Sequence, residues 1–183
     1  MDAKAAEISR DIQVSIVNGE KGSHTLEGQF SIAASSIAAW EILTDYDHLS
    51  AFVSSIKSSR IVSREKDHGM IEQVMTGKAG IFRKRITLLL EVNESPLQKI
   101  SFRDVSNKSF KSYSGSWLID STGDGIQVLY KLEATPRFFS PDFIAVGAFK
   151  KNVKLLLEEV RSEIIRRNKW KEVVEKDPGS KKY

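Results

Sequence analysis

Residues 140–165 read SPDFIAVGAFKKNVKLLLEEVRSEII. Ser140 suits an N-cap, Pro141 suits the first helical position, and Asp142 lies where the helix dipole favours an anion. Apolar side chains then recur every three or four residues, at Phe143, Val146, Phe149, Val153, Leu156, Val160 and Ile164. This spacing predicts one long amphipathic helix over 141–168, followed by a polar C-terminal tail over 169–183.

The sequence before this helix predicts a series of antiparallel strands. Runs with strand character cover 56–66, 70–77, 81–93, 98–105, 109–121 and 125–135. The breaks between the runs, such as Asp67-His68-Gly69 and Thr122-Gly123-Asp124-Gly125, are short enough for hairpin turns. No segment between the runs has the pattern of a crossover helix, so a meander of about six strands is expected.

The N-terminal third combines strand and short-helix patterns. Alternating apolar residues predict a strand over 24–32, while residues 11–17 either pair with it as a hairpin or stay outside the sheet. A serine N-cap at 35 or 36 begins a short helix over 36–44, and 46–52 can form a second turn. Residues 1–10 are expected to be a flexible N-terminus, which leaves 11–168 as a single domain.

These elements together predict an α+β fold. One long apolar helix face and one apolar sheet face must cover each other. A twisted antiparallel sheet of six to seven strands would curl around the C-terminal helix, with two short helices after the first main strand. A curled sheet and a straight helix do not fill all the space between them, so an internal cavity is expected.

Composition excludes several classes of protein. The chain has 183 residues, 40% of them hydrophobic, and no cysteine, which removes disulfides, thiolate nucleophiles and zinc–thiolate sites. The first residues lack the pattern of a secretory signal, and the longest apolar run, 143–149, is too short to span a bilayer. A soluble cytoplasmic protein is therefore expected.

The net charge of +4 is concentrated near the C-terminus. Residues 136–183 hold 12 basic and seven acidic side chains. This excess could face an anionic surface, but the interleaved glutamates favour an ordinary solvated helix face. Both readings remain open at this point.

Catalytic and metal-binding patterns are weak. His24, His48 and His68 are widely spaced and belong to no metal motif. The cluster Asp45-Tyr46-Asp47-His48 offers oxygen and nitrogen ligands in principle, but polarity at a helix end is the simpler interpretation. We therefore predict no catalytic residue, no metal and no cofactor.

Three groups of residues carry a family resemblance. They are the segment 35–46 with Leu49 and Phe52, the triplet Gly115-Ser116-Trp117, and a last group formed by Gly125, Val128, Tyr130, Leu132, Pro136 and Pro141. In their order and spacing they resemble the START-like, helix-grip (SRPBCC) superfamily, in its polyketide cyclase/dehydrase branch, which includes coenzyme-Q-binding proteins. The resemblance covers about 25–168 and departs where the family often has Phe-x-Pro, since Val53-Ser54 follows Phe52 here. It implies a helix-grip fold and a hydrophobic ligand cavity.

Ligand-binding residues are predicted on the apolar faces of the strands and the long helix. Tyr113, Trp117 and Tyr130 would bring polar groups to this interior, and mid-helix Gly147 costs about 1 kcal/mol relative to alanine, so it needs a reason. The predicted set is Met75, Phe82, Lys84, Ile86, Phe102, Tyr113, Trp117, Tyr130, Leu132, Phe143 and Gly147.

Three functions compete on these grounds. The first is binding or transport of a hydrophobic small molecule, such as a lipid, an isoprenoid quinone or a polycyclic compound, with a transient membrane contact through the basic last quarter or Arg137-Phe138-Phe139. The second is an aromatase/cyclase-type lyase that uses the same cavity. The third is a regulator that binds a ribosome or RNA, as another branch of the superfamily does, and we rank it last.

Overall fold

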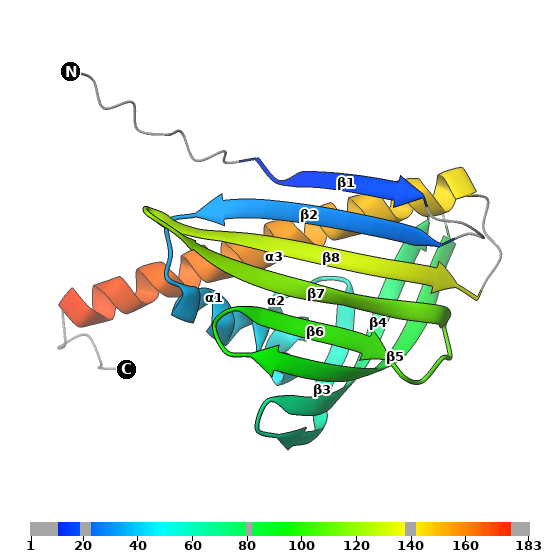
Figure 1. The fold of residues 1–183 in the computed structure, drawn as a ribbon, viewed down its shortest axis with the longest axis horizontal. Coiled ribbons are helices and arrows are strands. Elements are labelled where there is room, and N and C mark those ends of the chain that lie inside the picture. The colour runs from blue at the N-terminus through cyan, green and yellow to red at the C-terminus, as the bar shows by residue number, and fades with distance from the viewer. Residues whose placement is uncertain (1–10, 19–22, 80–81, 138–141, 177–183) are drawn as a thin grey trace.

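A computed structural model describes residues 11–18, 23–79, 82–137 and 142–176. The N-terminal part holds β1 (Gln13–Asn18), β2 (His24–Ile32), α1 (Ser36–Leu43), the 3-10 turn η2 (Tyr46–His48) and α2 (Leu49–Phe52). Six further strands follow: β3 (Ile56–Glu65), β4 (His68–Ala79), β5 (Phe82–Ser95), β6 (Lys99–Asp104), β7 (Phe110–Thr122) and β8 (Gly125–Pro136). The chain then forms the long helix α3 (Asp142–Lys176) (Figure 1).

The strands form one antiparallel sheet in the order β1-β2-β8-β7-β6-β5-β4-β3. Strands β3 to β8 are a meander, as the turn chemistry predicts. Strand β2 pairs with β8 from His24 opposite Ala134 to Ile32 opposite Ile126. Strand β1 joins the edge as a hairpin with β2, which settles the alternative left open above and brings the sheet to eight strands.

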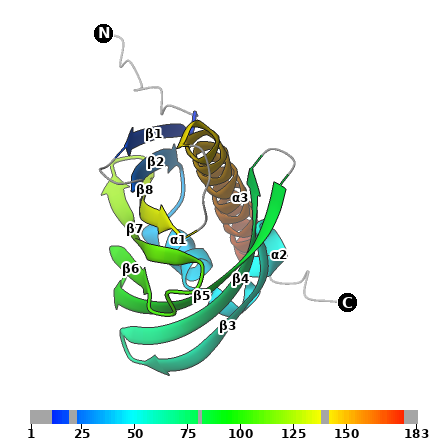
Figure 2. The ribbon, with the colours of Figure 1, turned by 90° about the vertical axis from the view of Figure 1, so that its right-hand side faces the viewer.

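The inner face of the sheet carries the alternating apolar residues of its strands. In β8, Ile126, Val128, Tyr130 and Leu132 are buried, and so are Leu88, Leu90 and Val92 in β5. The alternating apolar faces of β5 and β8 therefore form the interior. Figure 2 shows the sheet curving around this interior, with α3 crossing its concave side.

Helix α3 packs tightly against a glycine of β2. A Cβ atom on Gly28 would overlap Cδ1 of Leu157, and Leu157 is completely buried. The absence of a side chain at Gly28 therefore lets the helix backbone lie close to β2. The helix extends to Lys176, eight residues beyond the predicted end.

Two short helices cover one end of the concave face. Ser35 caps α1, and its hydroxyl accepts a hydrogen bond from the amide of Ala38 at 3.1 Å. Ala38, Ala39, Ile42 and Leu43 are buried in the same core as α3. The observed architecture is the predicted α+β helix-grip fold. In the part of the chain that the structure describes, no helix combines the length and apolar character needed to cross a bilayer.

Candidate ligand cavity

Two adjoining pockets lie between the concave sheet and α3, and they are called here the two lobes of a cavity. The first lobe, of about 90 Å³, lies toward α1 and α2 and is bordered by Leu43, Leu49 and Val53. The second, of about 70 Å³, lies between the end of β4, β5 and α3 and is bordered by Gly77, Ile86, Phe149 and Asn152.

Four residues border both lobes. They are Met75, Tyr113, Tyr130 and Leu156. The two volumes are small beside the roughly 300–1,000 Å³ of typical ligand pockets. A larger ligand therefore has to displace these shared side chains, and methionine, being unbranched and flexible, is well suited to move.

A continuous aromatic band forms one wall of the cavity. Phe110 contacts Tyr113 with ring centroids 4.9 Å apart, and Trp117 contacts Tyr130 at 4.4 Å. Phe102 links these pairs, lying 6.0 Å from Tyr113 and 6.1 Å from Tyr130. Strands β6, β7 and β8 thus contribute a band of rings that extends along both lobes.

A glycine makes room for the centre of this band. Gly115 lies opposite Phe102 in the β6–β7 register, and a Cβ atom there would come within 2.5 Å of Cζ of Phe102. The Phe102 ring consequently lies across the β7 backbone between the two tyrosines. This gives a structural reason for the glycine of the Gly115-Ser116-Trp117 triplet.

Tyr113 and Tyr130 form a hydroxyl pair at the junction of the lobes. Burial raises the pKa of Tyr113 to about 12, although the hydrogen bond with Tyr130 lowers it in part. Burial also raises the pKa of Tyr130 well above its usual value, and the neighbouring Tyr113 raises it further. Both hydroxyls therefore stay protonated at neutral pH. Two hydroxyls hold two protons and the bond between them uses one, so the pair keeps one O–H to donate.

Two further polar side chains reach the first lobe. The Tyr46 hydroxyl donates to Glu94 at 2.9 Å, and Arg64 pairs with the same carboxylate, also at 2.9 Å. Tyr46 therefore offers the lobe only its ring. Gln73 is buried and donates to the Ser59 hydroxyl at 3.3 Å, which leaves its carbonyl oxygen as an acceptor near the lobe.

The described lining carries no formal charge. Within residues 23–77, 84–137 and 147–168, whose side chains are placed, neither lobe is bordered by an aspartate, glutamate, histidine, lysine or arginine. An ion inside would lack a partner to offset the cost of leaving water. The cavity is therefore suited to an uncharged molecule with few polar atoms.

The acidic and histidine residues of Asp45-Tyr46-Asp47-His48 make structural contacts outside the cavity. Asp45 accepts from Arg167 of α3 at 2.9 Å and lies 2.6 Å from Nδ1 of His48. Burial alone would raise the pKa of Asp45, but these two hydrogen bonds outweigh it and hold the pKa below its ordinary value. Asp47 accepts from the Ile61 amide at 2.7 Å. These contacts tie α1 and η2 to α3 and to β3.

The structure brings seven of the eleven predicted residues to the lining. These are Met75, Ile86, Phe102, Tyr113, Trp117, Tyr130 and Leu132. Lys84 and Gly147 are exposed and border neither lobe, and a Cβ atom on Gly147 would meet nothing within 4 Å. The structure does not describe the side chains of Phe82 and Phe143, and Phe138 and Phe139 lie outside the described residues. Contact of any of these residues with a ligand stays a prediction.

Several residues that the fold brings to the lining were not predicted from the sequence. Gln73 lies between Ile71 and Met75 on the inner face of β4, and a polar residue in an apolar alternation was the available signal. Leu156 and Phe149 belong to the predicted helix stripe. The sequence had no signal that these two border open space.

Comparisons with known proteins agree with this geometry. Residues 32–161 match the family model described as polyketide cyclase / dehydrase and lipid transport. No curated protein matches the sequence significantly.

Several solved structures share the fold at low sequence identity. A STAR-related lipid transfer protein from Xanthomonas axonopodis is 17% identical, with a TM-score of 0.71 over 88% of this chain and 96% of that one. The Zhui aromatase/cyclase from Streptomyces sp. R1128 is 15% identical, with a TM-score of 0.68 over 79% and 95%. Human STARD10 is 10% identical, with a TM-score of 0.65 over 87% and 76%. Because the family model covers well over half of the sequence, this chain belongs to the polyketide cyclase / dehydrase and lipid transport family.

Proposed function

We propose that this protein binds, and carries between sites in the cytoplasm, an uncharged hydrophobic small molecule held between the sheet and α3. The observation that supports this most directly is the absence of formal charge from the described lining of both lobes. Burial of apolar ligand surface against the aromatic band would supply affinity, at about 25 cal/mol per Å².

The tyrosine pair suggests what the ligand carries. The O–H that Tyr113 and Tyr130 have left to donate lies at the junction of the lobes, where a ligand carbonyl or ether oxygen would satisfy it. The preferred ligand is a molecule with apolar parts on both sides of one acceptor group. Isoprenoid quinones and polycyclic ketones have this chemistry.

The enzymatic alternative has weaker support. A cyclase or dehydratase needs a group that accepts a proton near neutral pH. The raised pKa values of Tyr113 and Tyr130 keep both protonated, and neither lobe has a carboxylate or histidine in its described lining. We therefore favour binding without a chemical step.

The first experiment is native mass spectrometry of the purified protein, followed by organic extraction of any bound molecule. A stoichiometric neutral lipid, quinone or polyketide is expected. Empty protein is then titrated with Nile red, which has a carbonyl oxygen, and with diphenylhexatriene, which has no acceptor. A protein that carries nothing and takes up neither probe would contradict the proposal.

Two variants localise the binding. Met75→Trp fills the junction of the lobes and should weaken binding of both probes by about ten-fold or more, whereas Val62→Trp, at an exposed position of β3, should leave both unchanged. The double variant Tyr113→Phe/Tyr130→Phe removes both hydroxyls, so it should weaken Nile red by about two- to ten-fold through the lost hydrogen bond and leave diphenylhexatriene unaffected.

A further inference from the structure

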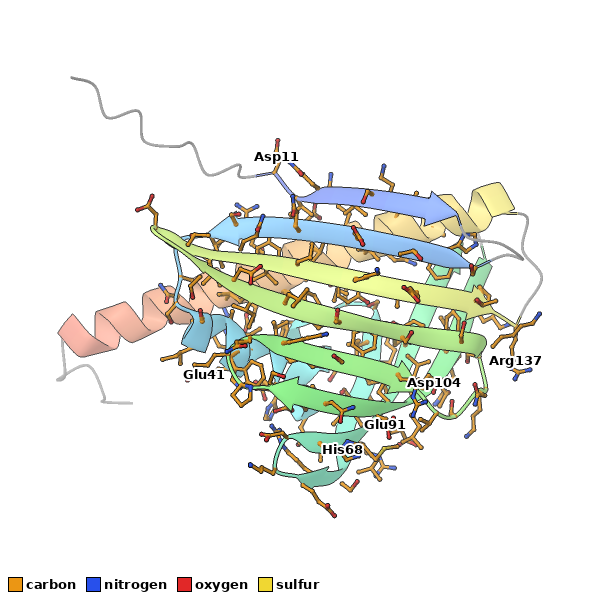
Figure 3. The ribbon with its side chains drawn as sticks, viewed as in Figure 1. Asp11, Glu41, His68, Glu91, Asp104 and Arg137 are labelled. Carbon is orange, nitrogen blue, oxygen red and sulfur yellow. The ribbon has the colours of Figure 1, made fainter. Side chains whose placement is uncertain are left out.

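Six exposed cations gather at one end of the molecule. They are Arg85, Lys108, Lys111, Arg137, Lys150 and Lys151, called here the basic rim. They come from the first residues of β5 and β7, the β6–β7 loop, the end of β8 and the early turns of α3, which lie at the same end of the sheet (Figure 1). Figure 3 shows Arg137 at this end and Glu41 of α1 at the opposite one.

Hydrogen bonds hold much of the rim together. The Arg137 amide donates to the Ser109 carbonyl at 3.2 Å, and its Nε donates to the Phe110 carbonyl at 3.1 Å. The Ser109 hydroxyl accepts from the Thr87 amide at 3.2 Å. The ends of β5, β7 and β8 are thereby joined, which places Arg85, Lys108, Lys111 and Arg137 on one connected stretch of surface.

Several rim residues are sequence neighbours of residues that border the second lobe of the cavity. Arg85 directly precedes Ile86, and Lys111 directly follows Phe110, both of which border that lobe. On α3, Lys150 and Lys151 lie between Phe149 and Asn152, which border it too. The same backbone segments therefore present apolar side chains to the lobe and cations to solvent.

The rim cations differ from several arginines elsewhere in the protein, which have acidic partners. Elsewhere Arg60 pairs with Glu72 at 2.7 Å, Arg64 with Glu94 and Arg167 with Asp45 at 2.9 Å each. None of the six rim cations forms an ion pair within the described chain.

The described carboxylates near the rim form no ion pair with it. Asp104 is buried and accepts from the Leu89 and Ser106 amides, while Glu133 lies 3.7 Å from Lys131. The rim is thus a surface of six cations that form no ion pair within the described chain, next to the segments that border the second lobe.

We propose that the basic rim docks the protein onto an anionic phospholipid surface, which brings the second lobe to the bilayer. Each lysine or arginine close to such a surface strengthens binding about five-fold. A nucleic acid would also be attracted by the charge, but it would gain nothing from the apolar lobe beside the rim. The inference rests on the proposed function in one respect, because an uncharged hydrophobic cargo would enter and leave through the membrane.

The test is co-sedimentation of the full chain with sucrose-loaded vesicles. We expect binding to vesicles of equal parts phosphatidylcholine and phosphatidylglycerol, reversal of that binding by added salt, and no binding to phosphatidylcholine alone. The double variant Lys108→Gln/Lys111→Gln should weaken binding about 25-fold. The matched control Lys66→Gln/Lys99→Gln removes two exposed cations away from the rim and should change binding less than about two-fold.

Several outcomes would overturn the docking surface. These are equal binding to both vesicle types, equal effects of the two double variants, or tighter binding of a fluorescent single-stranded RNA than of the anionic vesicles.

Nile red titration in solution separates this proposal from the proposed function. Nile red binding without vesicle binding would leave the cavity function standing and refute docking. Vesicle binding with the expected variant effects, but without Nile red uptake or an extractable ligand, would support docking and refute the cavity function.

Discussion

Helix α3 meets the sheet in two contrasting ways within a single turn. Leu157 packs on Gly28 of β2 with no space between helix and strand. Its neighbour Leu156 borders both lobes beside Met75, Tyr113 and Tyr130. The contrast shows that one side of the helix fixes the fold while the adjacent side leaves room for a ligand, so stability and binding should be separable by mutation.

The largest expected effect comes from truncating the two leucines. Leu157→Ala should lower the free energy of unfolding by about 2–5 kcal/mol, because it opens a void in a completely packed region. Leu156→Ala should cost less, since its side chain already borders open space, and it should enlarge the cavity. Urea denaturation and Nile red titration of both variants measure this. Equal losses of stability would show that the two sides of α3 do not differ.

Two glycines, one packed against α3 and one with open space around it, should respond oppositely to substitution by alanine. Gly28→Ala should destabilise the protein by about 1–3 kcal/mol, because the new methyl group would overlap Leu157. Gly147→Ala should stabilise it by about 0.5–1 kcal/mol, since alanine is the better helix former and nothing lies within 4 Å. Thermal unfolding of both variants gives the signs. A stability loss at Gly147 would indicate a packing role that the structure does not contain.

The cavity side should also respond to alkaline pH. The folded-state pKa of Tyr113 is raised to about 12, above the ordinary value near 10. The neutral form is thus favoured in the folded state, and its contribution to stability is fully present below about pH 10 and lost as the pH rises through about 12. Tyrosinate absorbance should show a late-titrating fraction that is reduced in Tyr113→Phe. A Tyr113→Phe curve identical to that of the unmodified protein would contradict this.

The smallest effect on stability is expected in acid, where the Asp45 carboxyl that links α1 to α3 becomes protonated. The hydrogen bonds to His48 and Arg167 lower the folded-state pKa of Asp45. The contribution of the Asp45 carboxylate to folding stability is present above the ordinary carboxyl pKa near 4. This contribution is lost as the pH falls through the lowered folded-state pKa. Asp45→Asn should reduce the acid sensitivity of unfolding by less than about 1 kcal/mol, because the pair is partly solvated. Glu65→Gln, at an exposed position, is the control. If the two variants showed the same dependence of stability on acid pH, Asp45 would not contribute to stability in the way described.

The fold was largely predictable because turn chemistry and side-chain alternation are local signals. Gly125 begins β8 where the turn predicts it, and the inner face of β8 follows the alternation. The end of α3 was missed because residues 169–183 were interpreted as a polar tail from their charged composition. Trp170, Val173 and Val174 in fact continue the three-to-four apolar spacing, and lysine and glutamate also favour a helix.

The site was predictable only in part because it depends on where elements cross in space. The place at which α3 crosses β2 decides that Gly28, and not Gly147, is the glycine of close approach. Lys84 shares the inner face of β5 by alternation, but it lies opposite Gly77 near the strand's exposed end. The arrangement of the aromatic band likewise requires the register that sets Phe102 opposite Gly115, which no local pattern encodes.

The pairing of β2 with β8 also sets the order in which the chain can complete its fold during synthesis. Phe30 pairs with Val128, so a strand made early waits for one made roughly a hundred residues later. Until β8 leaves the ribosome, β2 lacks the partner that occupies one of its edges, and its apolar side chains have no finished core. Translation speed and chaperone access over this interval should therefore influence the yield of folded protein more than they influence its final stability.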